Sequence, residues 1–136
     1  MTTTLVDSNV LLDIATEDPK WSTWSENALI DAADEGALAI NPIIYAEVSV
    51  GFTTIEDLDD AIPPETFTRM PLPFEAGFLA GKAFLTYRRR GGAKSTPLPD
   101  FYIGAHAAIA GFRLLTRDAA RYRTYYPSLD LIAPTH

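Results

Sequence analysis

Residues 2–14, which read TTTLVDSNVLLDI, decide how the fold begins. The run from Thr2 to Val6 is β-prone, and the Asp-Ser-Asn that follows it is typical of a turn or a helix cap. The apolar residues Val10 to Ile14 then indicate a short helix. The chain therefore opens with a strand that passes directly into a helix.

The rest of the chain repeats this alternation of strands and helices. Further short strands are predicted at 37–40, 67–70, 112–116 and 129–132. Helices are predicted at 21–35, 42–51, 54–61, 73–90, 99–111 and 118–125, and residues 91–96 read as a flexible glycine-rich loop. Strands that alternate with helices along a whole chain favour an α/β fold, with a parallel sheet and helices on both of its faces.

Length and composition exclude several classes of protein. The 136 residues suit a single domain, 1–136, and a composition of 47% apolar and 21% charged residues is ordinary for a globular chain. The absence of cysteine excludes disulfides, thiolate zinc sites and cysteine nucleophiles, and two histidines argue against a histidine-rich metal site. No apolar run is long enough for a membrane span, and the N-terminus lacks the basic start of a signal peptide. We therefore expect a cytoplasmic protein with no membrane partner.

The net charge of −7 argues against a nucleic-acid partner, but the charges are unevenly distributed. Residues 1–87 contain 3 basic and 15 acidic side chains, whereas residues 88–123 contain 8 basic and 2 acidic ones. This division is either chance variation on a solvated surface or a basic segment with a role of its own.

Three carboxylates are predicted at the starts of helices. Asp7 and Asp118 each follow a predicted strand, and ligands of open α/β sheets bind beyond the carboxyl ends of the strands. Asp100 begins a helix whose next two turns carry small residues, among them Gly104, so another element or a substrate could come close there. Each of the three has an alternative interpretation as a helix N-cap, in the case of Asp100 combined with tight helix packing.

A fourth carboxylate, Glu47, lies on the same helical face as Ile43 and Ile44. A carboxylate on an apolar face must be paired, protonated or bound to a metal, because burial of an isolated charge is costly. The alternative to a functional role is a buried salt bridge. Four carboxylates brought together without nearby cations would repel one another, unless a hard cation such as Mg²⁺ or Mn²⁺ lies among them. Metal-assisted hydrolysis is the chemistry that this sequence supports best.

Four segments of the chain also resemble the motifs of a known family. They are TLVDSNVLLD (4–13), NPIIYAEV (41–48), PDFYIGAHA (99–107) and LLTRDAARY (114–122). The order and spacing of these segments, and the total length of the chain, are similar to those of the PIN-domain nucleases. Among these nucleases, the chain resembles the VapC toxins of type II toxin–antitoxin modules.

The resemblance implies a three-layer PIN-like fold with about five parallel strands, and a Mg²⁺- or Mn²⁺-dependent endoribonuclease. It implies that Asp7, Glu47, Asp100 and Asp118 are the acidic cluster of the site. We expect Asp7, Asp100 and Asp118 to bind the metal, and Glu47 to be a further ligand or to organise a water that the metal binds. The residues expected to line this site are Ser8, Asn9 and Thr116. The resemblance also implies a homodimer that is inhibited by a cognate VapB-type antitoxin.

Given such a substrate, we expect the basic residues that end the long helix and enter the glycine loop to contact RNA phosphates. These residues are Arg88, Arg89, Arg90 and Lys94. The alternative is that they favourably cap the carboxyl end of the helix.

Other readings of the chain remain open. A phosphatase-type phosphotransferase would carry a second Asp two residues after Asp7, where this chain has Asn9, and a phospho-receiver domain would need a lysine beyond Lys94. A non-catalytic PIN-like protein that binds a basic peptide partner is the third alternative.

Several other conspicuous side chains are expected to be structural. Asp13 is predicted as a surface or helix-packing residue. Packing is predicted for His106, Trp21, Trp24, Tyr122, Tyr125 and Tyr126.

Overall fold

A five-stranded parallel sheet forms the centre of the molecule. The structure is a computed structural model that describes residues 2–94 and 98–135. Hydrogen-bonded neighbours in the sheet follow the order β3-β2-β1-β4-β5, and every pair is parallel. The strands are β1 (Thr4–Val6), β2 (Leu38–Ile40), β3 (Phe67–Arg69), β4 (Arg113–Leu115) and β5 (Leu131–Ile132).

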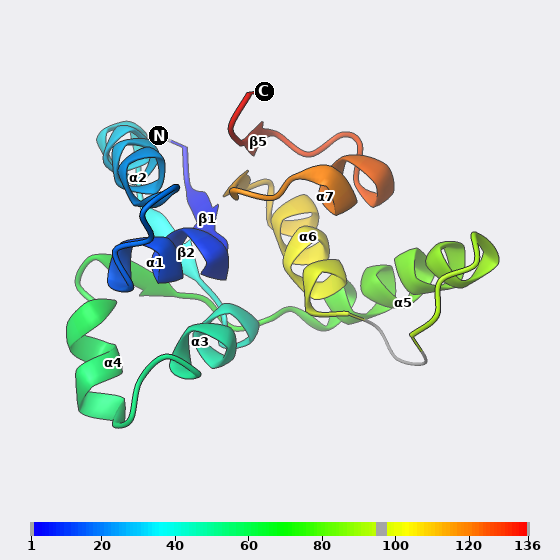
Figure 1. Ribbon diagram of the computed structural model, residues 1–136. Coiled ribbons are helices and arrows are strands. Elements are labelled where there is room, and N and C mark those ends of the chain that lie inside the picture. Colours follow the sequence, from blue (N-terminus) through cyan, green and yellow to red (C-terminus); the bar gives the residue numbers. More distant parts are fainter. Residues whose placement is uncertain (1, 95–97, 136) are drawn as a thin grey trace.

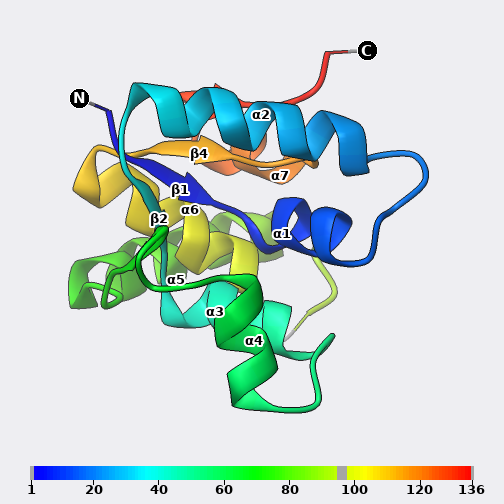
Figure 2. The same cartoon turned by 90° about the vertical axis from the view of Figure 1, so that its left-hand side faces the viewer.

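Helices cover both faces of this sheet, with α1 and α2 on one side and α5, α6 and α7 on the other (Figures 1 and 2). The helices are α1 (Ser8–Ala15), α2 (Ser22–Glu35), α3 (Pro42–Ser49), α4 (Ile55–Ala61), α5 (Phe74–Arg89), α6 (Pro99–Ala110) and α7 (Ala120–Tyr125). In the part of the chain that the structure describes, no helix has the length and apolar character needed to cross a bilayer.

The predicted α/β class and the PIN-like arrangement of a parallel sheet between helices are confirmed, and each predicted helix and strand is present. The first helix starts at Ser8 rather than at Val10, because the carboxylate of Asp7 accepts a hydrogen bond from the Ser8 N–H and caps it. The predicted glycine loop extends into residues 95 and 96, which lie outside the described residues.

The parallel register positions the candidate site. The central strands β1 and β2 are buried along their whole length, as expected for a sheet covered on both faces. Val6 at the end of β1 pairs with Leu115 at the end of β4. The next residues of the two strands, Asp7 and Thr116, therefore leave the sheet side by side.

Close packing of α6 against α7 explains the small residues of α6. A methyl group added at Gly104 would lie 2.5 Å from Cδ2 of Tyr126 and 3.1 Å from Cδ1 of Tyr122. The close approach expected beside Asp100 is thus made by two tyrosine rings, one in α7 and one directly after it.

His106 joins α6 to the start of α3 inside the core. Its side chain is 1% exposed, and its Nδ1 lies 3.0 Å from Nδ2 of Asn41. The side-chain oxygen of Asn41 accepts the N–H of Ile44 and caps α3. Burial lowers the pKa of His106, so the imidazole is neutral and serves as a structural acceptor.

The contact at Gly104 gives a prediction about stability. We expect Gly104→Ala to lower the free energy of unfolding by about 1–3 kcal/mol, because the added methyl group forces two packed rings apart. Glu26→Ala on α2 is the control, since this side chain is exposed to solvent. The control should change the free energy of unfolding by no more than about 0.5 kcal/mol. Urea denaturation measures both, and equal stability of the Gly104 variant and the parent would contradict this packing.

Candidate active site

The carboxylate of Asp7 is the most enclosed acidic group at the carboxyl edge of the sheet, and the side chain is 3% exposed. Its Oδ1 accepts the backbone N–H of Ser8 at 2.8 Å. Its Oδ2 accepts the hydroxyl of Thr116 at 2.9 Å and that of Tyr122 at 2.9 Å. The carboxylate is therefore held from α1, from the end of β4 and from α7.

Asp7 titrates far above the ordinary range of an aspartate. Burial raises the pKa of Asp7 from 3.8 to about 6, and the negative charge of Asp100 contributes in the same direction. The hydrogen bonds that Asp7 accepts lower its pKa and offset only part of this effect. The folded protein therefore disfavours the ionised form of Asp7.

Asp100 lies in the first turn of α6 and shares a hydrogen-bonding partner with Asp7. Its Oδ1 is 3.3 Å from the Tyr122 hydroxyl, and its Oδ2 is 3.4 Å from Nη1 of Arg121. Burial raises the pKa of Asp100 despite the guanidinium of Arg121. The N-cap of α6 is Leu98, so the interpretation of Asp100 as an N-cap is wrong.

Glu47 joins the site through Ser8. Its Oε1 accepts the Ser8 hydroxyl at 2.9 Å, and burial together with the charge of Asp100 raises its pKa. Within residues 2–94 and 98–135 no cationic side chain forms an ion pair with Glu47, so the alternative of a buried salt bridge is not observed.

Asp118 is exposed and lies at the open side of the site. Its backbone N–H donates to the Thr116 hydroxyl at 3.2 Å, and its charge contributes to the raised pKa of Asp100. Asp118 is not the N-cap of α7, a position held by Ala119. Asp100 and Asp118 line the same open hollow together with Tyr87, Ala120, Arg121, Thr124 and Tyr125.

The three polar residues expected to line the site lie among these acids. Ser8 bridges Asp7 and Glu47, as described above. Asn9 donates from Nδ2 to the Thr116 hydroxyl at 3.2 Å, and its Oδ1 accepts the backbone N–H of Arg117 at 3.1 Å. Asn9 therefore connects the start of α1 to the turn after β4.

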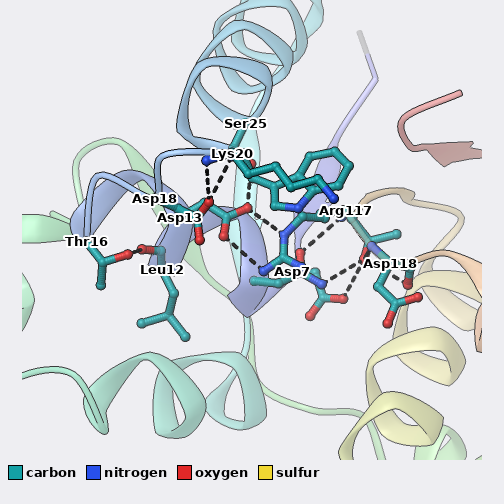
Figure 3. A network of polar contacts seen from close by, with 12 residues as sticks. Asp7, Leu12, Asp13, Thr16, Asp18, Lys20, Ser25, Arg117 and Asp118 are labelled. Carbon is teal, nitrogen blue, oxygen red and sulfur yellow. Dashed lines mark hydrogen bonds and ion pairs between the residues drawn. The ribbon is translucent and has the colours of Figure 1, made fainter. Parts of the chain in front are cut away.

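An ion pair between the buried Asp13 and the partly exposed Arg117 supports that turn (Figure 3). The Nε and Nη2 of Arg117 lie 2.8 and 3.0 Å from Oδ2 and Oδ1 of Asp13, and Oδ2 also accepts the hydroxyl of Ser25. The guanidinium lies 5.6 Å from the centre of the Trp21 ring. Asp13 is 3% exposed, so it is a helix-packing residue, and its placement on the surface is wrong.

Sequence reasoning missed the contribution of Tyr122 and Arg121. Tyr122 packs as predicted, but its hydroxyl also contacts two carboxylates. The available signal was its position four residues after Asp118 in the same segment, which places Asp118 just before α7 and Tyr122 in its first turn. That spacing alone does not indicate where the hydroxyl points.

The basic residues near the site have mixed roles. Nη1 of Arg88 donates to the carbonyl oxygen of Lys94 at 2.7 Å, so Arg88 closes the loop after α5. Arg89 and Arg90 are exposed, and the guanidinium of Arg90 lies 5.5 Å from the Tyr125 ring centre. For Arg88, a structural role at the end of the helix is therefore observed.

The acids form a donor set of carboxylate oxygens, which suits a hard divalent cation. Burial raises the pKa values of Asp7, Glu47 and Asp100, so a nearby positive charge would favour the ionised form of each carboxyl group. As the described side chains stand, however, no three of them are grouped closely enough to hold one metal ion. The chemistry of the site fits such an ion, and binding would require the carboxylates to turn toward it.

Comparison with known proteins places the chain among related folds. The model of the family described as PIN domain matches residues 4–125. No curated protein sequence gives a match.

Solved structures resemble the chain over almost its whole length. VapBC2 from Rickettsia felis, bound to a DNA fragment from its promoter, contains a chain with a TM-score of 0.75 and 18% identity; the match covers 98% of this chain and 100% of that one. VapBC-1 from nontypeable Haemophilus influenzae gives 0.72 and 17%, covering 97% and 98%. FitAcB from Neisseria gonorrhoeae gives 0.66 and 16%, covering 95% and 96%. At these identities the likeness shows a shared fold.

The raised pKa of Asp7 predicts how stability depends on pH. Because the folded state holds this proton up to about pH 6 and the unfolded state only to about 3.8, stability decreases as the pH rises between these values. Above them the ionised group costs at most about 3 kcal/mol. We expect Asp7→Asn to be more stable than the parent at neutral pH in chelator, and this gain to disappear in acid. Urea denaturation across this pH range measures the difference, and a variant that gains no stability at neutral pH would contradict the assignment.

Proposed function

Because the PIN domain model matches residues 4–125, the chain belongs to the PIN domain family, and on this premise we propose that it is a metal-dependent endoribonuclease that hydrolyses RNA phosphodiester bonds. The observation that carries the proposal is the placement of Asp7 and Asp100 on either side of one tyrosine hydroxyl, together with the raised pKa values of both carboxyl groups. Binding of a divalent cation would stabilise the ionised forms of these two buried carboxylates.

In this proposal Asp7, Asp100 and Asp118 hold Mg²⁺ or Mn²⁺, and Glu47 is a further ligand or orients a water. When bound, the ion supplies positive charge that favours ionisation of a water and offsets the charge that develops on the phosphate.

The polar residues around the acids orient them for this role. Ser8 and Thr116 fix the two oxygens of Asp7, and Ser8 also holds Glu47. Asn9 in turn fixes Thr116. Once the carboxylates have turned toward a bound ion, such hydrogen bonds would limit their further rearrangement during the reaction.

The basic segment supports an approach of RNA from the open side. Arg121 lines the hollow shared by Asp100 and Asp118, and Arg89 and Arg90 are exposed at the end of α5. We propose that the phosphate backbone follows these cations, and that Lys94 in the adjoining loop adds to them.

We also propose that the protein is the toxin of a type II toxin–antitoxin module, inhibited by a VapB-type antitoxin and acting in the cytoplasm. The support is that matching chains come from VapBC complexes and from a toxin–antitoxin complex of Klebsiella pneumoniae. The competing hypothesis is a non-catalytic PIN-like protein for a basic peptide partner, which would show no metal-dependent cleavage of RNA.

The surface of α5 supports the proposed homodimer. Phe74, Phe78 and Leu85 share one face of this helix and are 96%, 71% and 44% exposed. Gly77 and Gly81 lie among them, and an added Cβ at either glycine would meet nothing within 4 Å. In a symmetric dimer, the exposed phenylalanine rings of one copy can pack against the glycines on the same face of α5 in the other copy.

Cleavage of a total-RNA pool with Mg²⁺, Mn²⁺ or chelator tests the proposed activity. We expect the parent to cleave only with metal, and Asp7→Ala or Asp100→Ala to reduce the rate by at least about 100-fold while the fold persists by circular dichroism. Asp31→Ala on α2 is the control and should cleave like the parent. Cleavage by either site variant at the parental rate, or by the parent in chelator, would rule out the assignment.

The salt dependence of RNA binding tests the basic segment. In an Asp100→Ala background, Arg89→Gln with Arg90→Gln should weaken binding and reduce the slope of log K against log salt by about 0.7 for each lost phosphate contact. Lys82→Gln, earlier on the same helix, is the control and should leave the slope unchanged. An unaltered slope in the double variant would assign these arginines a structural role.

A further inference from the structure

Tyr122 places a single hydroxyl between two carboxylates. Its side chain is 1% exposed, and its oxygen lies 2.9 Å from Oδ2 of Asp7 and 3.3 Å from Oδ1 of Asp100. An ionised carboxylate is an acceptor only, and a phenol carries one hydrogen. Tyr122 can therefore satisfy only one of the two acids at a time, and the shorter distance favours Asp7.

Packing holds the ring of Tyr122 in this position. Its Cδ1 faces the backbone of α6 at Gly104, where a methyl group would lie 3.1 Å away. The neighbouring Tyr126 fills the rest of that contact and donates its hydroxyl to the carbonyl oxygen of Phe101 at 2.7 Å. The ring has little room to withdraw, but the O–H bond can still rotate.

The hydrogen-bond count at Asp7 shows what the Tyr122 hydroxyl contributes there. Oδ2 accepts both Thr116 and Tyr122, which occupies its two lone pairs, and Oδ1 accepts the N–H of Ser8. A cation that binds Oδ2 must displace one of the two hydroxyl hydrogens. Each has a second acceptor at 3.3 Å: Asp100 Oδ1 for Tyr122, and the carbonyl oxygen of Asp118 for Thr116.

We propose that the Tyr122 hydroxyl takes the place of a divalent cation between Asp7 and Asp100, and that its hydrogen must turn away before the cation can bind Asp7. The inference rests on the proposed function only in requiring that the site bind a divalent cation. The hydroxyl stabilises the metal-free site and competes with the metal. Its removal should therefore strengthen metal binding, the opposite of what loss of a ligand or of an orienting group would do.

Calorimetric titration with Mn²⁺ alone tests this, at about pH 8 so that the carboxylates are ionised. We expect Tyr122→Phe to bind Mn²⁺ roughly tenfold more tightly than the parent, the effect of losing one competing hydrogen bond to a charged group. Tyr126→Phe is the matched control, because it loses a buried hydroxyl directly after the same helix, and that hydroxyl donates to the carbonyl oxygen of Phe101. Its dissociation constant for Mn²⁺ should equal that of the parent.

Thermal unfolding provides a second measurement on the same proteins. The rise in unfolding temperature between chelator and Mn²⁺ should be larger for Tyr122→Phe than for the parent, because only the metal-free state loses the bond. A purely structural role would lower both temperatures equally, as expected for Tyr126→Phe.

The outcomes separate this inference from the proposed function. Unchanged or weaker Mn²⁺ binding by Tyr122→Phe overturns the role of Tyr122 and leaves the nuclease proposal standing. If the parent binds Mn²⁺ but cleaves no RNA, the nuclease proposal is overturned. The role of Tyr122 is then decided by whether Tyr122→Phe binds Mn²⁺ more tightly than the parent does. A parent that binds no Mn²⁺ overturns both.

Discussion

The carboxylate of Asp7 is the group on which the rest of the site depends. It caps α1, receives hydroxyls from the end of β4 and from α7, and repels the nearby carboxylate of Asp100. One buried charge thus fixes where three elements meet at the carboxyl edge of the sheet. Its hydrogen bonds keep it in place without neutralising it, which leaves a position that favours a cation.

Two contacts that do not involve the candidate metal-binding carboxylates hold the elements around Asp7 in place. The ion pair between Asp13 and Arg117 secures the turn after β4, and Gly104 lets α7 lie directly against α6. Such supporting contacts keep acidic side chains oriented although their mutual repulsion favours their separation.

Much of the fold could be predicted because its determinants are local. Strand–helix alternation and the caps at Asp7 and Asn41 are set by neighbouring residues, and parallel pairing then brings the residues after β1 and β4 together. The direction of the Tyr122 hydroxyl and the exposure of Asp118 depend on how α7 packs against α6. Such contacts between distant segments leave no periodic pattern in the sequence. The net charge was equally uninformative, because it adds a basic segment to an acidic one.

The titration of Asp7, followed by the NMR signal of its carboxyl carbon with and without Mg²⁺, tests the central claim most directly. Without a cation the midpoint should lie at about 6, because the group is buried beside Asp100. With Mg²⁺ it should fall well below that value, since a bound cation stabilises the ionised form. An Asp7 midpoint near the ordinary 3.8 in chelator, or a midpoint that Mg²⁺ does not move, would contradict the account. In either case Asp7 would not be a buried carboxylate whose ionised form a divalent cation stabilises.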